Sequence, residues 1–226
     1  MAKDEDIAKV PTQASLALSE PKTLSLAQSA AVVDVPITIK KGYLTPKQQA
    51  LLLREAQGYP YTRPEVQVFG KKHVIPRSQV WFADAGCDTA FSGLMIQAQP
   101  WPYYANRLRQ QLEKDFALAA NGVLINHYAN GEQSMGWHSD NEPEFAPNSD
   151  IASVSLGASR DFVIRHKDSQ YKQVISLAAG DLLIMHWPMQ QHWEHALPKR
   201  LKVTEARINF TFRQITPNFF NLDGEG

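Results

Sequence analysis

The triplet His138-Ser139-Asp140 is the pattern in the sequence that most clearly suggests chemistry. Residues i and i+2 of a β-strand project from the same face, so the imidazole of His138 and the carboxylate of Asp140 should point at one spot. One histidine from a distant strand would complete a facial triad of two histidines and one carboxylate. Such a triad suits non-haem Fe(II) and leaves coordination positions open. By itself the triplet is a weak signal, because three residues match by chance in many proteins.

The third ligand could come from any of six other histidines. A lone histidine on a strand is more often an ordinary core or surface residue than a metal ligand. Residue type alone therefore leaves the choice open. The six are His73, His127, His166, His186, His192 and His195.

Residues 207–213, Arg-Ile-Asn-Phe-Thr-Phe-Arg, alternate strictly between polar and apolar side chains. In a strand, the polar side chains share one face and the apolar ones share the other. One interpretation is an edge strand with a solvated polar face. The other is a pocket for a dianion, because arginine binds carboxylates in a bidentate fork and two arginines match a dicarboxylate. The polar face consists of Arg207, Asn209, Thr211 and Arg213.

Two helices are predicted ahead of these motifs. Residues 45–48, Thr-Pro-Lys-Gln, supply an N-cap, a proline at the first helical position and a capping-box glutamine, so a helix should follow through Ala56. A second helix is predicted over residues 102–120, where leucines and a phenylalanine recur every four residues. Asn121-Gly122 should end it.

Short strands account for most of the remaining chain. Valines at alternate positions predict a hairpin over residues 66–82 that turns around Gly70-Lys71. Turn residues separate the other predicted strands. Two helices followed by many short strands predict an α+β fold with a sandwich or jelly roll. These strands are expected at 36–39, 123–128, 151–156, 161–165, 173–177, 182–186 and 207–215.

Length and composition restrict the class of protein. The chain has 226 residues, of which 43% are hydrophobic, enough for one cored domain with an appendage. Residues 1–34, rich in Ala, Ser, Lys, Glu and Pro, are predicted to be a disordered tail ahead of a domain over 35–226. The formal net charge is zero, which excludes a strongly basic, histone-like binder.

The predicted location follows from what the chain lacks. Cys87 is the single cysteine, which fits a reducing compartment. No secretory signal and no apolar run of the length needed to cross a bilayer are apparent. We therefore expect a soluble intracellular monomer without a membrane partner, cytoplasmic if bacterial and nuclear if eukaryotic.

Taken together, the spaced motifs resemble the AlkB family of Fe(II)- and 2-oxoglutarate-dependent dioxygenases over about residues 63–216. Segments 66–71, 151–157 and 160–167 look most like its double-strand-preferring nuclear repair branch. The resemblance implies a double-stranded β-helix (jelly roll) with flanking N-terminal helices. The motifs that carry it are Asn126-x-Tyr128, Gly136-Trp137-His138-Ser139-Asp140, Trp193-Glu194-His195 and the alternating Arg207, Asn209, Thr211 and Arg213.

The resemblance also assigns ligands. It implies that His138, Asp140 and His195 hold Fe(II) and form the catalytic centre. The family places the third ligand two residues after a tryptophan, which favours His195 over its rivals His192 and His186. The co-substrate 2-oxoglutarate would chelate the iron, and Arg207 would pair with its distal carboxylate. The other residues implied for the co-substrate pocket are Asn126, Tyr128, Asn209, Thr211 and Arg213.

The implied reaction is oxidative dealkylation of N-alkylated bases such as 1-methyladenine and 3-methylcytosine in single- or double-stranded DNA. The reaction consumes O2 and 2-oxoglutarate and releases formaldehyde, succinate and CO2. One alternative is the same iron chemistry on RNA or protein. Another is a jelly-roll module that binds Zn and has no activity, although a structural metal site has no need of two arginines for a dicarboxylate.

Several residues are expected to contact the substrate. Phe69, at the tip of the predicted hairpin, would enter the base stack as an apolar wedge. Phe91 and His138 match family positions that sandwich the flipped base, and Glu142 matches one near its exocyclic edge. Basic residues of segments 63–79 and 160–172 would follow the phosphates. These are Arg63, Lys71, Lys72 and Arg77 in the first segment and Arg160, Arg165, Lys167 and Lys172 in the second.

The sequence departs from the family pattern in two places near the substrate. Thr89 stands where the family branch carries an aromatic residue. The stretch 167–173 is shorter than in that branch, where a longer loop grips the opposite strand. A preference for duplex is therefore less firmly implied than the iron chemistry.

Overall fold

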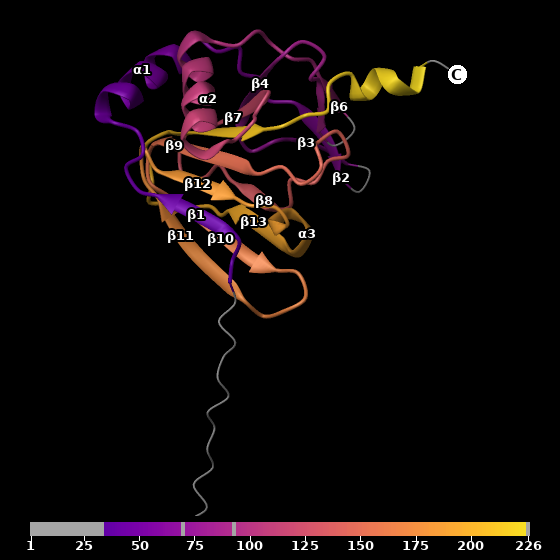
Figure 1. The fold of residues 1–226 in the computed structure, drawn as a ribbon. Coiled ribbons are helices and arrows are strands. Elements are labelled where there is room, and N and C mark those ends of the chain that lie inside the picture. Colours follow the sequence, from indigo (N-terminus) through magenta and orange to yellow (C-terminus); the bar gives the residue numbers. More distant parts are fainter. Residues whose placement is uncertain (1–33, 69–70, 92–93, 225–226) are drawn as a thin grey trace, which may run out of the picture. The chain divides into compact units, whose positions relative to one another are not determined.

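The computed structural model describes residues 34–68, 71–91 and 94–224 (Figure 1). By its contacts the chain divides into two units, residues 1–32 and 33–226, and the second contains every described element. The predicted disordered tail lies outside the described residues except for Asp34, and the proposed wedge Phe69 lies outside them entirely. Among the described helices, none is long and apolar enough to cross a membrane.

Two antiparallel sheets face each other across a hydrophobic core (Figure 1). The larger sheet has the strand order β1-β12-β9-β14-β7-β4, and the smaller has the order β11-β10-β13-β8. The larger comprises β1 (Ile37–Lys40), β12 (Leu182–Met185), β9 (Ile151–Gly157), β14 (Arg207–Arg213), β7 (Gly122–Tyr128) and β4 (Ser78–Ala83). The smaller comprises β11 (Lys172–Leu177), β10 (Arg160–His166), β13 (Trp193–Leu197) and β8 (Met135–His138).

Apolar side chains from both sheets pack into a shared core, as the alternation in the sequence predicts. Ile151 and Leu183 from the larger sheet lie in one cluster with Phe162, Ile164 and Trp193 from the smaller one. Strands β10, β11 and β12 each contribute two residues at alternate positions to this cluster. The α+β double-stranded β-helix (jelly roll) expected from the sequence is confirmed.

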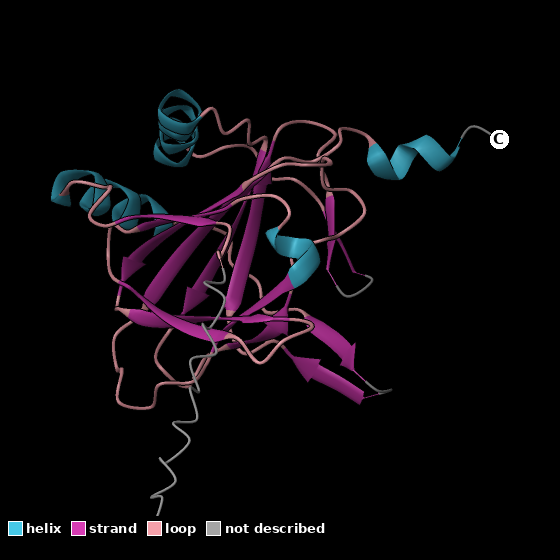
Figure 2. Cartoon of the chain, turned by 60° about the horizontal axis from the view of Figure 1, so that its bottom comes forward, coloured by secondary structure: helices cyan, strands magenta, loops and turns pink. Residues whose placement is uncertain are grey.

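Two helices, α1 (Pro46–Ala56) and α2 (Tyr103–Phe116), pack on the outer face of the larger sheet (Figure 2). The capping box predicted at the start of α1 is present, since the Thr45 side chain accepts from Gln48 N and Gln48 Oε1 accepts from Thr45 N at 3.0 Å. Helix α2 is shorter than predicted. It ends at Phe116 because Ala117 adopts a left-handed conformation, with φ of 54°.

The predicted hairpin over 66–82 is divided between two sheets. β2 (Glu65–Val68) pairs with β3 (Lys71–Val74) in a separate ribbon, whereas β4 joins the larger sheet beside β7. Pro76, which has no N–H to donate, lies in the turn that separates the two pairings. The sequence did not predict β5 (Thr89–Phe91), β6 (Leu94–Ile96), β8, β13, α3 (Met189–His192) or the 3₁₀ helix at Phe219–Gly224.

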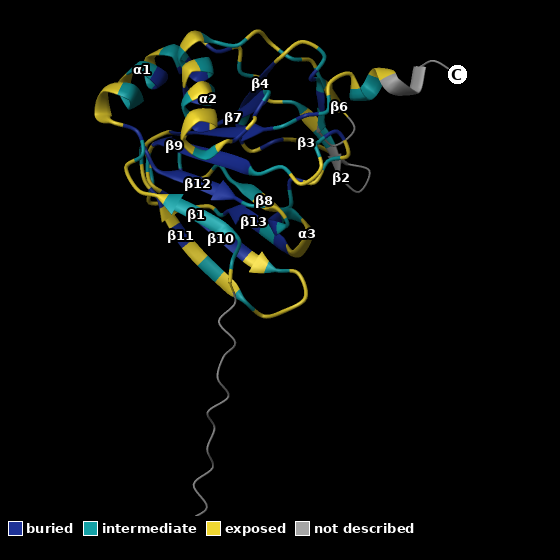
Figure 3. Cartoon of the chain, in the orientation of Figure 1, coloured by how far each residue is buried: buried dark blue, intermediate teal, exposed yellow. Residues whose placement is uncertain are grey.

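Strand β14 lies between β9 and β7, and all seven of its residues are buried (Figure 3). The interpretation of residues 207–213 as an edge strand with a solvated face is therefore wrong. Its apolar face packs under α1 and α2 through Ile208, Phe210 and Phe212. Its polar face lines a pocket instead of meeting solvent.

Candidate functional site

His138, Asp140 and His195 lie close together between the two sheets. Their candidate ligand atoms all fall within 4.8 Å of one another. Asp140 Oδ1 is 3.7 Å from His138 Nε2, and Asp140 Oδ2 is 3.8 Å from His195 Nε2. Two imidazole nitrogens and a carboxylate converging on one point form the donor set of a facial triad.

The local backbone differs from the predicted one, because β8 ends at His138 and Asp140 lies in the turn that follows. The shared strand face is thus not what aligns the two side chains. Two hydrogen bonds hold the turn in place: Ser139 Oγ donates to Trp193 O at 2.8 Å, and Asp140 N donates to Gln190 Oε1 at 2.9 Å. Residues of β13 and α3 therefore position the carboxylate.

The two rival histidines have other partners. His186 lies between Asp150 Oδ2, at 2.7 Å from its Nδ1, and Thr38 Oγ1, at 2.8 Å from its Nε2. His192 is exposed on α3 and stacks on His166 with ring centroids 6.4 Å apart. Neither belongs to the cluster, and His195 is the histidine that the fold brings beside Asp140.

Charge and protonation in the cluster suit a cation. His138 Nδ1 lies 2.9 Å from Gly136 O, and because a carbonyl can only accept, Nδ1 is the donor of this contact and Nε2 is the nitrogen that faces the site. Burial, reinforced by His138, lowers the pKa of His195 to about 3. Burial would raise the pKa of Asp140, but Arg213 and the two histidines lower it below its usual range. At neutral pH the cluster therefore presents the neutral imidazole of His195 and the carboxylate of Asp140, with Nε2 of His138 beside them.

The polar face of β14 forms a buried chain of hydrogen bonds beside this cluster. Arg207 Nη2 donates to Ser155 Oγ at 2.9 Å and to Asn209 Oδ1 at 2.8 Å. Asn209 Nδ2 donates in turn to Thr211 Oγ1 at 2.8 Å, and Ser153 Oγ donates to Asn209 Oδ1 at 3.0 Å. These contacts hold the face rigid around the guanidinium.

Strand β7 supplies the adjacent wall of the same pocket. Tyr128 pairs in register with Arg207, and Asn126 pairs with Asn209. The guanidinium carbon of Arg207 lies 5.7 Å from the centroid of the Tyr128 ring. The pocket between these strands is thus lined by all six residues expected to bind the co-substrate, together with His138, Asp140 and His195.

Arg213 links the polar face to the cluster. Its Nη2 donates to Asp140 Oδ1 at 2.7 Å, and both side chains are almost fully buried. Arg213, one of the six residues expected to bind the co-substrate, therefore also contacts the candidate metal ligand Asp140. One guanidinium can fix the orientation of the carboxylate and balance its charge at once.

The residues present fit both Fe(II) and 2-oxoglutarate, the two groups that the sequence motifs imply. Among the described residues no carboxylate forms an ion pair with Arg207, and its Nε has no hydrogen-bond partner. A buried cation in that condition calls for an anion. His195 Nδ1 and Arg213 Nε are also buried without partners in the described part of the chain. The donor set of the cluster suits Fe(II), and the polar face suits a carboxylate.

Sequence reasoning missed three supporting residues. Ser153 and Ser155 alternate with apolar residues along β9, and this period-two signal could have placed them on the same face as the pocket. Gln190 could not have been found in this way. It reaches Asp140 N from α3, fifty residues away in sequence.

Two expected phosphate contacts are buried instead, so these predictions are wrong. Arg77 is 2% exposed, and its Nε donates to Asn126 Oδ1 at 2.9 Å, beside the polar pocket. Arg160 is also 2% exposed and donates to the carbonyls of Asn130, Gln133 and Pro198. Both guanidiniums satisfy internal acceptors, and neither side chain forms a surface for phosphates.

The remaining substrate residues have mixed outcomes. Lys72 is exposed, as a phosphate contact must be, while the side chains of Lys71 and Phe91 lie outside what the structure describes. Glu142 lines a small hollow with His138 and Arg213. Burial raises its pKa to about 7, against the lowering effect of Arg213.

Thr89, where the sequence departs from the family pattern, lines the same hollow as Glu142. Its Oγ1 donates to Glu144 Oε1 at 2.8 Å, and Ala90 N donates to the same oxygen at 2.9 Å. The threonine is therefore fixed by a buried carboxylate.

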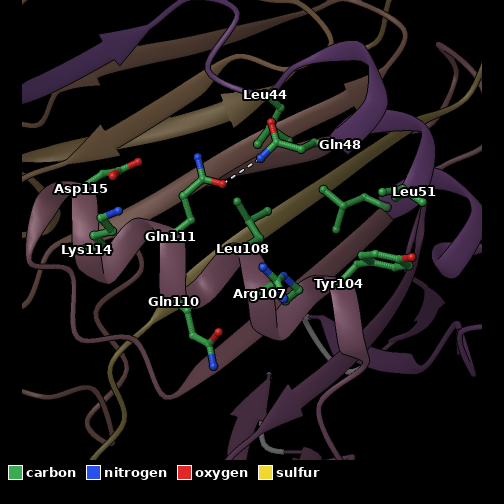
Figure 4. A pocket seen from close by; sticks show the side chains of 11 residues that line it. Leu44, Gln48, Leu51, Tyr104, Arg107, Leu108, Gln110, Gln111, Lys114 and Asp115 are labelled. Atoms are coloured by element: carbon green, nitrogen blue, oxygen red, sulfur yellow. Dashed lines mark hydrogen bonds between the residues drawn. The ribbon is translucent and has the colours of Figure 1, made fainter.

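A larger hollow, of about 560 Å³, lies between α1 and α2 (Figure 4). Leu51 and Leu108 face it, and Gln48 Nε2 donates to Gln111 Oε1 across it at 2.8 Å. None of the predicted site residues lines this hollow. The one cluster of metal-ligating side chains found among the described residues lies elsewhere, at His138, Asp140 and His195. Its size alone does not indicate a function.

Comparison with known proteins gives consistent matches. The sequence profile of the 2OG-Fe(II) oxygenase superfamily matches residues 36–213. The chain is 42% identical over 174 residues to DNA oxidative demethylase ALKBH2 of Mus musculus, covering 74% of this chain and 73% of that protein. It is 44% identical over 172 residues to the Homo sapiens protein of the same name, covering 73% of this chain and 66% of the human one, just under two thirds.

A comparison of folds agrees with these matches. The solved structure of OsALKBH1 superimposes with a TM-score of 0.53 at 16% identity, covering 80% of this chain and 99% of that one. At this level of identity the likeness concerns the fold alone. It supports the two-sheet architecture described above.

Proposed function

Because the chain belongs to the 2OG-Fe(II) oxygenase superfamily and, within it, to the AlkB family, we propose that it is a DNA oxidative demethylase that repairs N-alkylated bases. The enzyme is a dioxygenase, and its family uses Fe(II), 2-oxoglutarate and O2. The observation that carries the proposal is the contact between Arg213 and Asp140, which joins a three-ligand cluster to a buried pocket for a dicarboxylate.

In the proposed site, His138, Asp140 and His195 hold Fe(II). When bound, the metal would supply, with 2-oxoglutarate and O2, the oxidising chemistry that removes an N-methyl group as formaldehyde, with succinate and CO2 as the other products. The fold keeps the imidazole of His195 neutral and the carboxylate of Asp140 ionised, which is the protonation state that these two ligands need.

The co-substrate is oriented by the polar face of β14. Arg207 pairs with the carboxylate of 2-oxoglutarate farther from the metal, because it is a buried cation without a carboxylate partner in the described chain. Asn209 and Thr211 continue the polar face toward Arg213, with Asn126 and Tyr128 on the neighbouring strand. Water is excluded because every one of these side chains is buried.

The base is proposed to enter from the side opposite the co-substrate pocket. Two hollows share His138, Asp140 and Arg213: one contains Arg207, and the other contains Glu142 and Thr89. A carboxyl group with a pKa of about 7 can donate or accept a hydrogen bond at the exocyclic edge of a flipped base.

The substrate class follows from the relatives. The two mammalian relatives reported above are named DNA oxidative demethylases, so we assign a nucleic acid as the partner and alkylated DNA, single- or double-stranded, as the substrate. We also propose that the chain acts as a monomer where DNA is held, in the cytoplasm of a bacterium or the nucleus of a eukaryote.

The proposal is tested with an oligonucleotide that carries one 1-methyladenine. The full chain is loaded anaerobically with Fe(II) and 2-oxoglutarate, mixed with duplex or single strand and exposed to air, and the product is weighed by mass spectrometry. The oligonucleotide should lose the mass of one methylene. His138→Ala should abolish this loss, whereas His192→Ala, which removes an exposed histidine outside the cluster, should preserve it.

Two results would contradict the proposal in different ways. Succinate formed without any change in the oligonucleotide would keep the iron chemistry and reject DNA as substrate, so the same lesion would then be tried in RNA. Absence of succinate under every condition would support a metal-binding module without activity.

A further inference from the structure

The face of the smaller sheet that points away from the core carries a row of apolar side chains. Val174 on β11 pairs with Val163 on β10, and Val163 pairs with Ala196 on β13. Ala196 lies opposite the irregular part of β8 that contains Trp137. Val174 and Trp137, at the two ends of the row, are 55% and 36% exposed, so apolar side chains meet solvent at both ends.

This row forms the floor of a hollow of about 390 Å³. Trp137 forms one wall, and Lys172, Lys199 and Arg200 are the charged residues that line the hollow. Arg200 is already paired with Asp161 at 2.7 Å, so the two lysines are the cations available to a ligand. No carboxylate is among its lining residues. An apolar floor with an aromatic wall and cations at the rim suits a ligand that is both flat and anionic.

A second hollow, of about 460 Å³, adjoins the other side of Trp137 and Lys172. Its single lining carboxylate, Glu194, is already paired with Arg165 at 2.6 Å. The guanidinium carbon of Arg165 lies 4.3 Å from the centroid of the Trp137 ring, and Lys172 Nζ lies 5.6 Å from it. The tryptophan thus lies between two cationic hollows, and cation–π contacts with Arg165 and Lys172 fix the orientation of its ring.

We propose that Trp137 is a stacking platform for an unpaired base of the nucleic acid substrate, with Lys172 and Lys199 binding the neighbouring phosphates. This proposal deepens the proposed function and depends on it for the choice of ligand. Any of the four bases can stack on an exposed aromatic side chain, and cations beside that side chain can bind the phosphates of the backbone. An uncharged peptide would use the apolar floor but would leave Lys172 and Lys199 without an anionic partner.

The position of Trp137 also suits this role. The residue directly precedes His138, whose side chain faces the metal cluster on the opposite side of β8. Strand β8 is the edge strand of the smaller sheet. A nucleic acid strand that passes round this edge can place one nucleotide at the cluster and a flanking nucleotide on Trp137.

The proposal is tested by binding, without turnover. The full chain, held anaerobically with Fe(II) and 2-oxoglutarate, is titrated into an unmodified, fluorescently labelled single-stranded DNA and followed by anisotropy. Trp137→Ala should weaken binding by about tenfold, within the range expected for one stacked base. Trp137→Phe should restore most of the affinity because a smaller ring still stacks. Lys199→Ala should reduce the slope of log K against log salt concentration by about one.

Matched controls separate this proposal from the proposed function. Tyr103→Ala removes an exposed aromatic side chain of α2 that lines neither hollow. This variant should bind the DNA with wild-type affinity. Wild-type affinity in Trp137→Ala would overturn the platform, and so would equal losses in the alanine and phenylalanine variants. Because the assay uses undamaged DNA, its outcome does not depend on demethylation. If Trp137→Ala fails to fold, the exposed Lys199→Ala variant decides the test, and an unchanged salt slope would then overturn the proposal.

Discussion

Arg213 donates from Nη2 to Asp140 Oδ1 at 2.7 Å, and the two side chains are 8% and 3% exposed. The pair connects the end of the central strand β14 with the turn after β8. Because both groups are buried, the loss of either would leave the other as an uncompensated buried charge. The contact makes the orientation of a candidate metal ligand depend on a residue of the co-substrate pocket.

Replacing Arg213 with methionine should destabilise the metal-free protein by about 3–5 kcal/mol at pH 7, because a buried carboxylate loses its counter-charge. The pKa of Asp140 is lowered in the folded state, so the pair contributes stability that is present above the ordinary carboxyl pKa and is lost as the pH falls. The difference between variant and wild type in urea unfolding should therefore shrink at acid pH.

The control for this prediction is Lys72→Met, which removes a distant ion pair at the surface. Lys72 Nζ lies 3.9 Å from Glu65 and both side chains are largely exposed, so the cost should stay below about 1 kcal/mol. Equal destabilisation by Arg213→Met and Lys72→Met would contradict the role assigned to the buried pair.

Replacing Arg207 with alanine should weaken the binding of 2-oxoglutarate to the metal-loaded protein by about 30-fold or more, because a buried charged partner is lost. Arg207→Lys should recover part of the affinity, since it keeps the charge and loses the fork. Isothermal titration calorimetry measures both variants. Ser155→Ala removes one hydrogen bond to Arg207 and should cost less than tenfold; unchanged affinity in Arg207→Ala would reject the assignment.

Glu142→Gln should stabilise the metal-free protein at pH 8 and have little effect at pH 5. Burial raises the pKa of Glu142 to about 7, so the folded state favours the protonated form. Its contribution to stability is therefore present at low pH and is lost as the pH rises through about 7. Melting temperatures of both proteins at several pH values test this, and a difference that does not vary with pH would contradict it.

Arg160→Ala should destabilise the protein by about 3 kcal/mol or more, because three carbonyls lose a charged donor. The salt dependence of DNA binding should not change, since Arg160 is buried. Lys172→Ala is the matched case from the same segment, and it should reduce the salt slope while leaving stability nearly unchanged. If Arg160→Ala reduced the slope of log K for DNA binding against log salt concentration, Arg160 would contact a phosphate after all.

Residue types and their periods determined much of the fold and of the site. The capping box at Thr45 and the alternation of residues 207–213 identified a helix and the central strand, because these patterns depend on neighbours in the chain. The same local patterns, together with the family motifs, named the three cluster residues and the polar face of β14. They also overextended α2, because a left-handed alanine has no clear signature in sequence.

Only the tertiary structure decided which charges are internal and which residues act as supports. Arg77 and Arg160 look like surface cations in the sequence, yet each is buried against acceptors from other segments. The candidate ligand Asp140 is held by Gln190 and Arg213, which lie fifty and seventy-three residues away from it. The sequence by itself determined the chemistry available to this protein, because that depends on residue type and local spacing. The fold decided where each charge lies, since burial depends on contacts between distant segments.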